Sequence, residues 1–243
     1  LLDKYFKKEI KPLRKEPKNK LIDYLGWHKQ NEEYCFVGLP LLSGRLHGEK
    51  KSLIREIVKK YNLDLRLTPN QDILLCNISN KHKLDIKKEL LKIGYDNLNE
   101  INEIQRHALA CPALPLCGLA MTEAERILPN VLTRIDDLIK SLNIKKTILF
   151  RMTGCPNGCT RPYMAELALV GSGQNKYQLW LGGSKNLQRL AKPYLQRMEL
   201  DDLEKTLKPL LIHWKECDSE SDFGDFIDSQ SESSIINLLN EIQ

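Results

Sequence analysis

The stretches ACPALPLCGLA (residues 110–120) and TGCPNGCTRPY (residues 153–163) hold four of the chain's seven cysteines. The four form two pairs, spaced C-x5-C and C-x3-C: Cys111 and Cys117, then Cys155 and Cys159. Four thiolates that converge from separate loops are typical ligands of an iron–sulfur cluster. The glycines and prolines around them allow the backbone to fold close to a bulky inorganic group. The spacing therefore predicts a [4Fe–4S] site made by these four residues.

Zinc is the main alternative for the same four sulfurs. Structural zinc sites usually use C-x2-C knuckles or Cys/His pairs, and the wider spacings here fit that pattern poorly. Two of the cysteines precede a proline, and the second pair encloses Pro-Asn-Gly, which is typical of loops. Of the remaining cysteines, Cys35 and Cys76 lie in strand-like apolar runs and are expected to be buried structural thiols, and Cys217 begins a polar tail.

Composition and length place the chain among globular proteins. Its 243 residues are enough for one large domain or two small ones, and 42% are hydrophobic and 28% charged. No apolar stretch approaches the roughly 18 residues that a membrane span needs. Paired cysteines in a chain of this size indicate a metal-binding, intracellular protein rather than a disulfide scaffold. The sequence begins at Leu1 without a signal-peptide pattern, which is consistent with a fragment of a longer chain.

The charge is distributed unevenly. Residues 217–243 contain seven acidic residues and no Lys or Arg, so residues 1–216 carry a formal charge of +12, against +5 for the whole chain. A basic body suits an acidic protein partner or an anionic cofactor, and it equally suits nucleic acid or a merely solvated surface. No stacking-aromatic motif of the RNA-recognition type is present, so nucleic acid is not expected as a partner.

Hydrophobic periodicity predicts two α+β units. Residues 1–20 read as a short helix and a linker, and residues 217–243 as a mobile acidic tail up to a short terminal helix. Residues 21–100 are predicted to form a small ferredoxin-like sandwich in the order strand, helix, strand, strand, helix. Its predicted elements are the strands 34–40, 64–68 and 72–76 and the helices 51–61 and 81–93.

Residues 101–216 are predicted to form an α/β domain with a mixed sheet around the cysteines. Thr122 and Glu125 predict a capping box for a helix that Pro129 ends. The other predicted elements are the helices 132–142 and 201–214, the second bent at Pro209, and the strands 147–152, 166–172 and 177–184.

The segments ACPALPLCGLAMTEAERILP and MTGCPNGCTRPYMAELALVG together resemble the cluster signature of the sirohaem-dependent sulfite and nitrite reductase family. The second segment contains T-G-C-x3-C, six further residues, and then an acidic residue, Glu166, with Leu167, Ala168 and Leu169 after it. DYLGWH, LTPNQDILLC and YQLWLGG also resemble this family. The resemblance covers roughly residues 20–216, is closest to the ferredoxin-dependent sulfite reductases of cyanobacteria and plastids, and identifies the chain as the C-terminal half.

The resemblance implies an activity and its cofactors. In such enzymes a [4Fe–4S] cluster shares one cysteine thiolate with sirohaem iron, and by its place in the motif that cysteine is Cys159. Electrons arrive from reduced ferredoxin, and sulfite is reduced to sulfide with six electrons at the haem. The enzyme would be cytoplasmic or in the plastid stroma, without a membrane. The basic residues that bind sulfite mostly belong to the N-terminal half, so this half alone is expected to be inactive.

Four further residues are predicted to contact the cofactors. Sirohaem carries eight carboxylates, so its pocket should be rich in hydrogen-bond donors and cations. Asn70 and Gln71 lie in a turn that resembles a sirohaem-contacting loop, although ordinary turn chemistry also explains them. Asn157 is expected to donate to a cluster sulfur or a haem carboxylate, or to stabilise its turn. Arg161 is expected to pair with a haem carboxylate or with a surface acid. Weaker candidates are Arg45, Arg66, Thr68, Arg106 and His107.

Two other functions remain open. A nitrite reductase would use the same cofactors and electron count, but CPALPLC, the TEAER segment and Gly158 favour sulfite. A plain iron–sulfur electron carrier would need no haem pocket and would leave the resemblance of the first domain unexplained.

Overall fold

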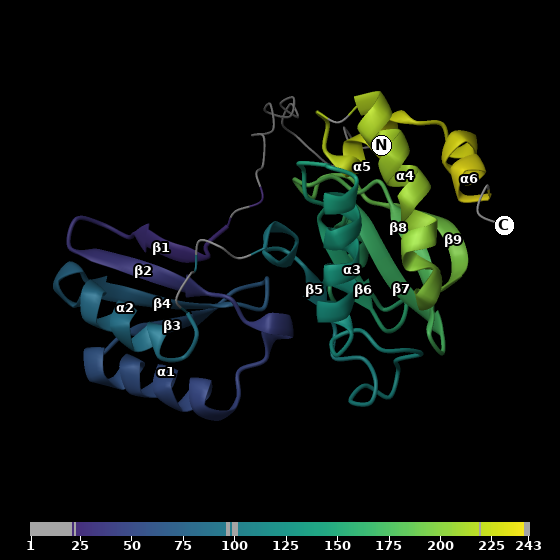
Figure 1. The fold of residues 1–243 in the computed structure, drawn as a ribbon. Coiled ribbons are helices and arrows are strands. Elements are labelled where there is room, and N and C mark those ends of the chain that lie inside the picture. Colours follow the sequence, from purple (N-terminus) through teal and green to yellow (C-terminus); the bar gives the residue numbers. More distant parts are fainter. Residues whose placement is uncertain (1–20, 22, 96–97, 99–101, 219, 241–243) are drawn as a thin grey trace, which may run out of the picture.

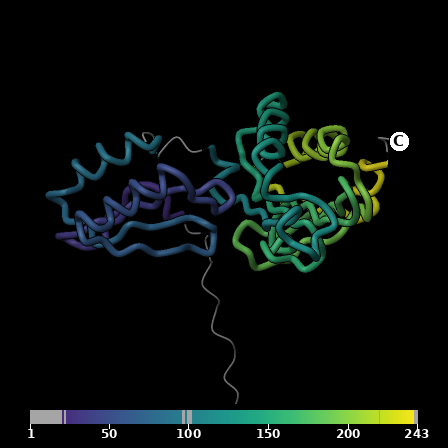
Figure 2. Tube along the Cα trace, turned by 90° about the horizontal axis from the view of Figure 1, so that it is seen from below, coloured from purple at the N-terminus to yellow at the C-terminus, as the bar shows by residue number. Residues whose placement is uncertain are grey.

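The computed structural model describes residues 21, 23–95, 98, 102–218 and 220–240, in two lobes that lie side by side (Figures 1 and 2). The predicted linker, residues 1–20, lies outside the described residues. An α+β architecture with a mixed second sheet is confirmed. Among the described residues, no helix is both long enough and apolar enough to cross a membrane.

The first lobe is a four-stranded antiparallel sheet with two helices on one face (Figure 1). The strands, in the spatial order β1-β2-β4-β3, are β1 (Gly26–Lys29), β2 (Tyr34–Leu39), β3 (Asp64–Leu67) and β4 (Ile73–Ser79). The helices are α1 (Gly48–Tyr61) and α2 (Lys83–Leu91). Their buried side chains Ile54, Ile57, Ile86 and Leu90 pack on Val37, Leu39 and Leu75 of the sheet. The predicted element order is therefore confirmed, with β1 added at one edge.

The second lobe is built around a five-stranded mixed sheet in the order β5-β6-β7-β8-β9. Its strands are β5 (Leu109–Ala110), β6 (Phe150–Thr153), β7 (Leu167–Gly173), β8 (Lys176–Leu181) and β9 (Lys192–Glu199). β5, β6 and β7 run parallel, and β8 and β9 run antiparallel to their neighbours. Both cysteine loops follow the carboxyl ends of parallel strands, β5 and β6, so both loops begin at the same edge of the sheet.

Helices α3 (Leu128–Ser141) and α4 (Leu203–Asp218) pack together over this sheet, in one core with its inward side chains. Pro209 lies inside α4, which the structure assigns as one helix. Strands β5 and β9 were missed by the sequence analysis. β5 has only two residues, and half of β9 is exposed with no regular alternation of polar and apolar side chains.

The acidic C-terminal segment differs from the sequence expectation. The predicted short terminal helix is present as α6 (Glu232–Asn240), but the segment before it forms α5 (Phe223–Ser229) instead of a mobile tail, and both helices pack against α4 (Figure 1). Phe223, Phe226 and Ile227 are buried in the main core together with Trp214. The acidic residues occupy the outer face of these short helices, so composition suggested disorder although the apolar residues are spaced to pack.

The predicted capping box at Thr122 is also wrong. No helix is present at residues 122–127, and α3 begins at Leu128 with Pro129 in its first turn, where a missing N–H costs nothing. The Thr122 hydroxyl donates to the Tyr177 hydroxyl at 3.1 Å and accepts the Asn175 N–H at 3.2 Å. The Thr122 side chain, which resembled a helix cap, therefore makes tertiary contacts with Tyr177 and Asn175 instead.

Candidate functional site

The two cysteine loops are joined by backbone hydrogen bonds. The Gly154 carbonyl accepts the N–H groups of Met121 and Thr122 at 2.8 and 3.3 Å, and the Cys111 N–H donates to the Met152 carbonyl at 3.4 Å. The Gly154 N–H in turn donates to Cys111 Sγ at 3.3 Å. The loop that carries the first pair is therefore held against the loop that carries the second, although the loops are about forty residues apart in sequence.

Glycine at position 154 is what permits this approach. A Cβ atom there would lie 2.7 Å from both the Ala113 Cβ and the Thr122 carbonyl oxygen, closer than real Cβ contacts allow. In the C-x3-C loop, Gly158 has φ +67°, a left-handed conformation that favours glycine. Gly154 thus lets the two cysteine loops pack closely against each other, and the close approach of the backbone to an inorganic group stays a prediction.

The four sulfurs differ in exposure along the site. Cys111 and Cys155 are buried, Cys117 is half-buried and Cys159 is exposed. Burial raises the pKa of the Cys111 thiol, the Gly154 and Ala113 N–H groups oppose this rise, and the nearby Cys159 and Cys155 sulfurs add to it. Cys111, Cys155 and Cys159 therefore lie near enough to interact. The exposed Cys159 lies on the outer side, where a thiolate is free to meet a second group.

Within the described part of the chain, no three His, Cys, Asp or Glu side chains are grouped as ligands of one metal ion. A four-iron cluster distributes its thiolates over separate iron atoms, so its ligands need not meet at a single point. The donor set of four cysteines on two joined loops suits such a cluster, and cluster ligation by these residues stays a prediction.

Three of the other predicted residues come together between the lobes. The Arg161 side chain, through Nη2, donates to the Pro69 carbonyl at 3.0 Å, and the Gln71 side chain, through Nε2, donates to the Ala110 carbonyl at 3.1 Å. Both bonds cross from one lobe to the other and reach the cysteine loops. The 68–71 turn is thereby fixed beside the residues that flank Cys111 and Cys159.

A cavity of about 390 Å³ opens at this junction. Asn70, Arg161 and Thr68 line it, with Arg106 and Asp23. The Thr68 hydroxyl accepts the N–H groups of Asn70 and Asp72, so Thr68 shapes the turn. The Asn70 amide reaches the cavity as a potential donor.

Asn157 and the weaker candidates are placed differently. Asn157 is exposed at the tip of the C-x3-C loop. Arg106 forms ion pairs with Asp23 at 2.5 Å and Glu103 at 3.0 Å, and Arg66 lies exposed on the edge strand β3. The charge of Arg106 is therefore compensated within the chain.

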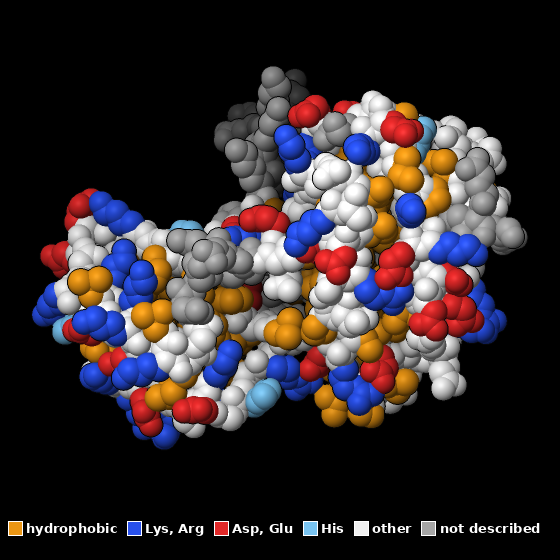
Figure 3. All heavy atoms as spheres, in the orientation of Figure 1, with side chains coloured by type: hydrophobic (Ala, Val, Ile, Leu, Met, Phe, Trp, Pro, Cys, Tyr) orange, Lys and Arg blue, Asp and Glu red, His pale blue; other side chains and the backbone are white. Residues whose placement is uncertain are grey.

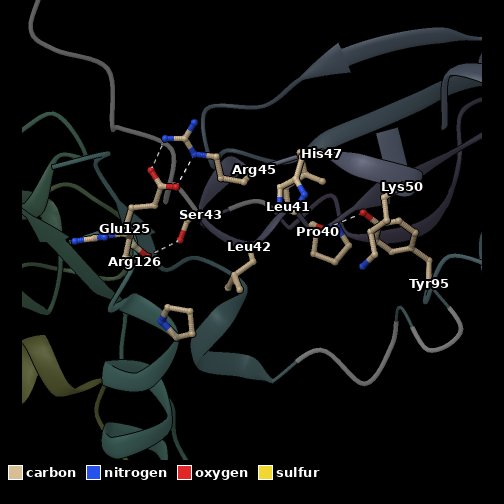
Figure 4. Close-up of a pocket in the computed structure, with 11 residues that line it drawn as sticks. Pro40, Leu41, Leu42, Ser43, Arg45, His47, Lys50, Tyr95, Glu125 and Arg126 are labelled. Carbon is tan, nitrogen blue, oxygen red and sulfur yellow. Dashed lines mark hydrogen bonds and ion pairs between the residues drawn. The ribbon is translucent and has the colours of Figure 1, made fainter. Parts of the chain in front are cut away.

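A second cavity, of about 380 Å³, lies at the other side of the junction (Figure 4). Arg45 crosses it and pairs with both carboxylate oxygens of Glu125, at 2.5 and 2.7 Å, and the Ser43 hydroxyl donates to the Glu125 carbonyl. Arg45, a weaker candidate for cofactor binding, thus joins the two lobes, and it lines a further cavity with Gln71 and with Pro112 of the first cysteine loop.

Arg151 was missed by the sequence analysis. It lies in β6, four residues before Cys155, and has no exposed surface. Its Nη1 donates to the Arg161 carbonyl at 3.2 Å, whereas its Nε and Nη2 have no partner. The signal in the sequence was a lone arginine in the apolar strand ILFRM. Buried unpaired donors beside a cysteine loop fit a site that receives an anionic group, as a thiolate-bound cluster and a carboxylate-rich haem would require.

Glu166 also has a defined role. It is fully buried, and its two carboxylate oxygens accept the N–H groups of Leu149 at 2.8 Å and Gly224 at 2.9 Å. Burial raises its pKa to about 7, against the opposing effect of the two N–H groups. The acidic residue of the signature therefore ties the sheet to the C-terminal helix α5.

Comparison with known proteins finds sulfite and nitrite reductases. A family model described as the nitrite/sulfite reductase ferredoxin-like half domain matches residues 28–93. The "Sulfite reductase [ferredoxin]" of Synechococcus elongatus is 45% identical over 233 residues, which cover 93% of this chain and 37% of the relative. The "Sulfite reductase [NADPH] hemoprotein beta-component" of Staphylococcus epidermidis is 37% identical over 211 residues, covering 84% of this chain and 37% of the relative.

Solved structures share the fold. The Mycobacterium tuberculosis NirA protein matches with a TM-score of 0.73 at 19% identity, over 91% of this chain and 43% of its own. Dissimilatory sulfite reductase I matches with a TM-score of 0.59 at 10% identity, over 85% of this chain and 69% of its own. The chain thus spans little more than a third of the length of the curated relatives it matches.

Proposed function

We propose that this chain, which belongs to the nitrite and sulfite reductase family, is the cluster-binding C-terminal half of a ferredoxin-dependent sulfite reductase. The observation that carries the proposal is the pair of cysteine loops joined through Gly154, beside the cavity between the lobes. The remaining length of the relatives leaves room for an N-terminal half, which would supply the basic residues for sulfite. The proposed location is the cytoplasm or the plastid stroma.

The four cysteines would hold a [4Fe–4S] cluster, and Cys159 would share its thiolate with sirohaem iron. The exposure of Cys159 supports this assignment, because a bridging thiolate must be reachable from outside the cluster loops. When bound, the coupled cofactors would supply the electron transfer that reduces sulfite to sulfide with six electrons.

The chain's other residues would bind and orient. The Gly154 N–H donates to Cys111 Sγ and would stabilise the thiolate form of that ligand. Asn70 and Arg161, which line the cavity, would face haem carboxylates, and so would Gln71 from the same turn as Asn70, with the 68–71 turn held by the bond from Arg161 to Pro69. Asn157, exposed at the loop tip, would donate to a cofactor oxygen or sulfur.

Charge on one face of the molecule fits a protein partner better than nucleic acid. On the face drawn in Figure 3, Lys and Arg side chains are interspersed with Asp and Glu, without one continuous basic field. An acidic donor such as ferredoxin requires local complementarity rather than a long basic stripe.

The test is the visible spectrum of the complete natural protein, purified without oxygen, before and after addition of sulfite. Sirohaem bands over an iron–sulfur background, shifted by sulfite, are expected. Cys159→Ser should abolish haem–cluster coupling, and Cys217→Ser, at an exposed position outside the site, should leave the spectrum unchanged. A featureless spectrum with zinc as the bound metal would refute the proposal, and turnover with nitrite but not with sulfite would identify a nitrite reductase.

A further inference from the structure

Arg151 is a buried cation without an anion. Its side chain is 0% exposed, and its one hydrogen bond goes to a neutral carbonyl, that of Arg161. Nε and Nη2 have no partner, and among the described residues no carboxylate pairs with the guanidinium. A buried, unpaired charge is costly, and natural structures rarely retain one without a compensating group.

The surroundings make the imbalance larger. Burial, and after it the Arg161 charge, lower the pKa of Arg151 to about 10, so the side chain remains charged at neutral pH. His107 lies two residues before Leu109, which pairs with Arg151 across β5 and β6. Burial lowers the His107 pKa, the Arg106 and Arg151 charges lower it further, and Asp23 and Glu103 oppose this, so the imidazole is neutral at pH 7. Its Nδ1 is also buried without a partner. Neither neighbour supplies negative charge.

Arg151 lies close to the second cysteine loop. Arg151 donates to the carbonyl of Arg161, two residues after Cys159, a chain distance of at most about 7 Å. The adjacent Met152 carbonyl accepts the Cys111 N–H and the Thr160 hydroxyl. The Arg151 guanidinium therefore contacts the segment that follows Cys159, and Arg151 lies on the strand that leads into the second cysteine loop.

We infer that the charge of Arg151 is balanced by the thiolate-ligated cluster and raises the reduction potential of that cluster. The inference rests on the proposed function. Four thiolates give a bound cluster net negative charge, and one-electron reduction by the donor adds one more, so a fixed cation nearby stabilises the reduced form more than the oxidised form. Because Arg151 has no exposed surface, it acts through its field and not by contact with substrate.

The expected change in the reduction potential of the cluster follows from Coulomb's law. Two unit charges about 10 Å apart, at an effective dielectric constant of about 20, change an equilibrium roughly tenfold. For a one-electron couple a tenfold change corresponds to about 59 mV.

The experiment is a reductive titration of the complete, ligand-free holoprotein, in which the reduced cluster is followed by electron paramagnetic resonance. Arg151→Gln should make the reduction potential of the cluster more negative by about 59 mV, the equivalent of a tenfold change. Arg151→Lys keeps the charge and should leave the potential near that of the unaltered protein. Arg134→Gln is the matched control, because Arg134 is paired with Glu204 away from the loops.

A second variant does not alter the strand. His107→Glu places a carboxylate beside Arg151 and should lower the potential in the same direction, which decides the matter if Arg151→Gln fails to fold. Unchanged potentials in both Arg151→Gln and His107→Glu would overturn the inference alone. Loss of haem from Arg151→Gln with an unchanged cluster potential would also overturn it, since the charge would then serve the haem. A complete protein without any cluster would overturn the proposed function and this inference together.

Discussion

Glu166→Gln should change how the stability of the chain depends on pH. The ordinary pKa of a glutamate is 4.5, and in the fold that of Glu166 is raised to about 7, chiefly by burial. Between these values Glu166 ionises in the unfolded chain and stays protonated in the folded one, so its contribution to stability is greatest below pH 4.5 and falls as pH rises toward 7. At about 1.4 kcal/mol per pH unit, the full loss is about 3 kcal/mol.

Glutamine does not titrate, so the variant lacks this loss. Its single carbonyl oxygen replaces two acceptors for the N–H groups of Leu149 and Gly224, which should cost about 1–3 kcal/mol at pH 5. The free energy of unfolding of the unaltered chain minus that of the variant should therefore fall by about 2.5 kcal/mol between pH 5 and pH 8.

The assay is urea unfolding at several pH values, followed by the fluorescence of the buried Trp214. Glu204→Gln is the matched control: its side-chain bond to Arg134 lowers the Glu204 pKa, so that contribution is lost only as pH falls, and the difference should stay constant from pH 5 to 8. A constant difference for Glu166→Gln over the same range would refute the reasoning.

Three other changes test separate parts of the structure. Gly154→Ala should destabilise the chain by about 1–3 kcal/mol in urea unfolding, because its Cβ would overlap the opposite cysteine loop, whereas Gly118→Ala, with open space around its Cβ, should not; equal effects would contradict the loop packing. Phe226→Ala should lower the free energy of unfolding by about 3–5 kcal/mol, and Asn237→Ala, at an exposed position, by less than about 0.5 kcal/mol. A Phe226→Ala variant as stable as the unaltered chain would mean that the C-terminal segment is not part of the core. Arg161→Ala removes the bond to the Pro69 carbonyl and should speed hydrogen exchange at the Gln71 N–H about fivefold, with Arg66→Ala as the unaffected control; unaltered exchange would show that the turn does not depend on that bond.

Local pattern was enough for much of this protein. The C-x5-C and C-x3-C spacings, the alternating strands and the amphipathic helices depend on neighbours within a few residues, and they predicted both lobes and the loops that carry the cysteines. Asn70, Gln71 and Arg161 were also nominated from local motifs. The structure brings Asn70 and Arg161 to one cavity between the lobes, whereas Gln71 bonds to the Ala110 carbonyl.

Contacts between distant residues decided the rest. Thr122 and Glu125 resembled a helix cap. Instead, Thr122 bonds to Tyr177, 55 residues away, and Glu125 bonds to Arg45, 80 residues away. The acidic tail has a composition typical of disordered segments, yet its few apolar side chains pack into the core formed by α4 and the sheet. Whether Arg151 is paired depends on every group that surrounds it in three dimensions.

Local spacing in the sequence was thus enough to nominate the residues proposed to carry the chemistry and to predict the period of most elements, because both depend on residues close together in the chain. Tertiary structure alone decided that Gly154 joins the two cysteine loops, that Glu166 anchors α5, and that Arg151 is buried without an anion. Burial and charge compensation are sums over all neighbours in space, and most of those neighbours are far away along the chain.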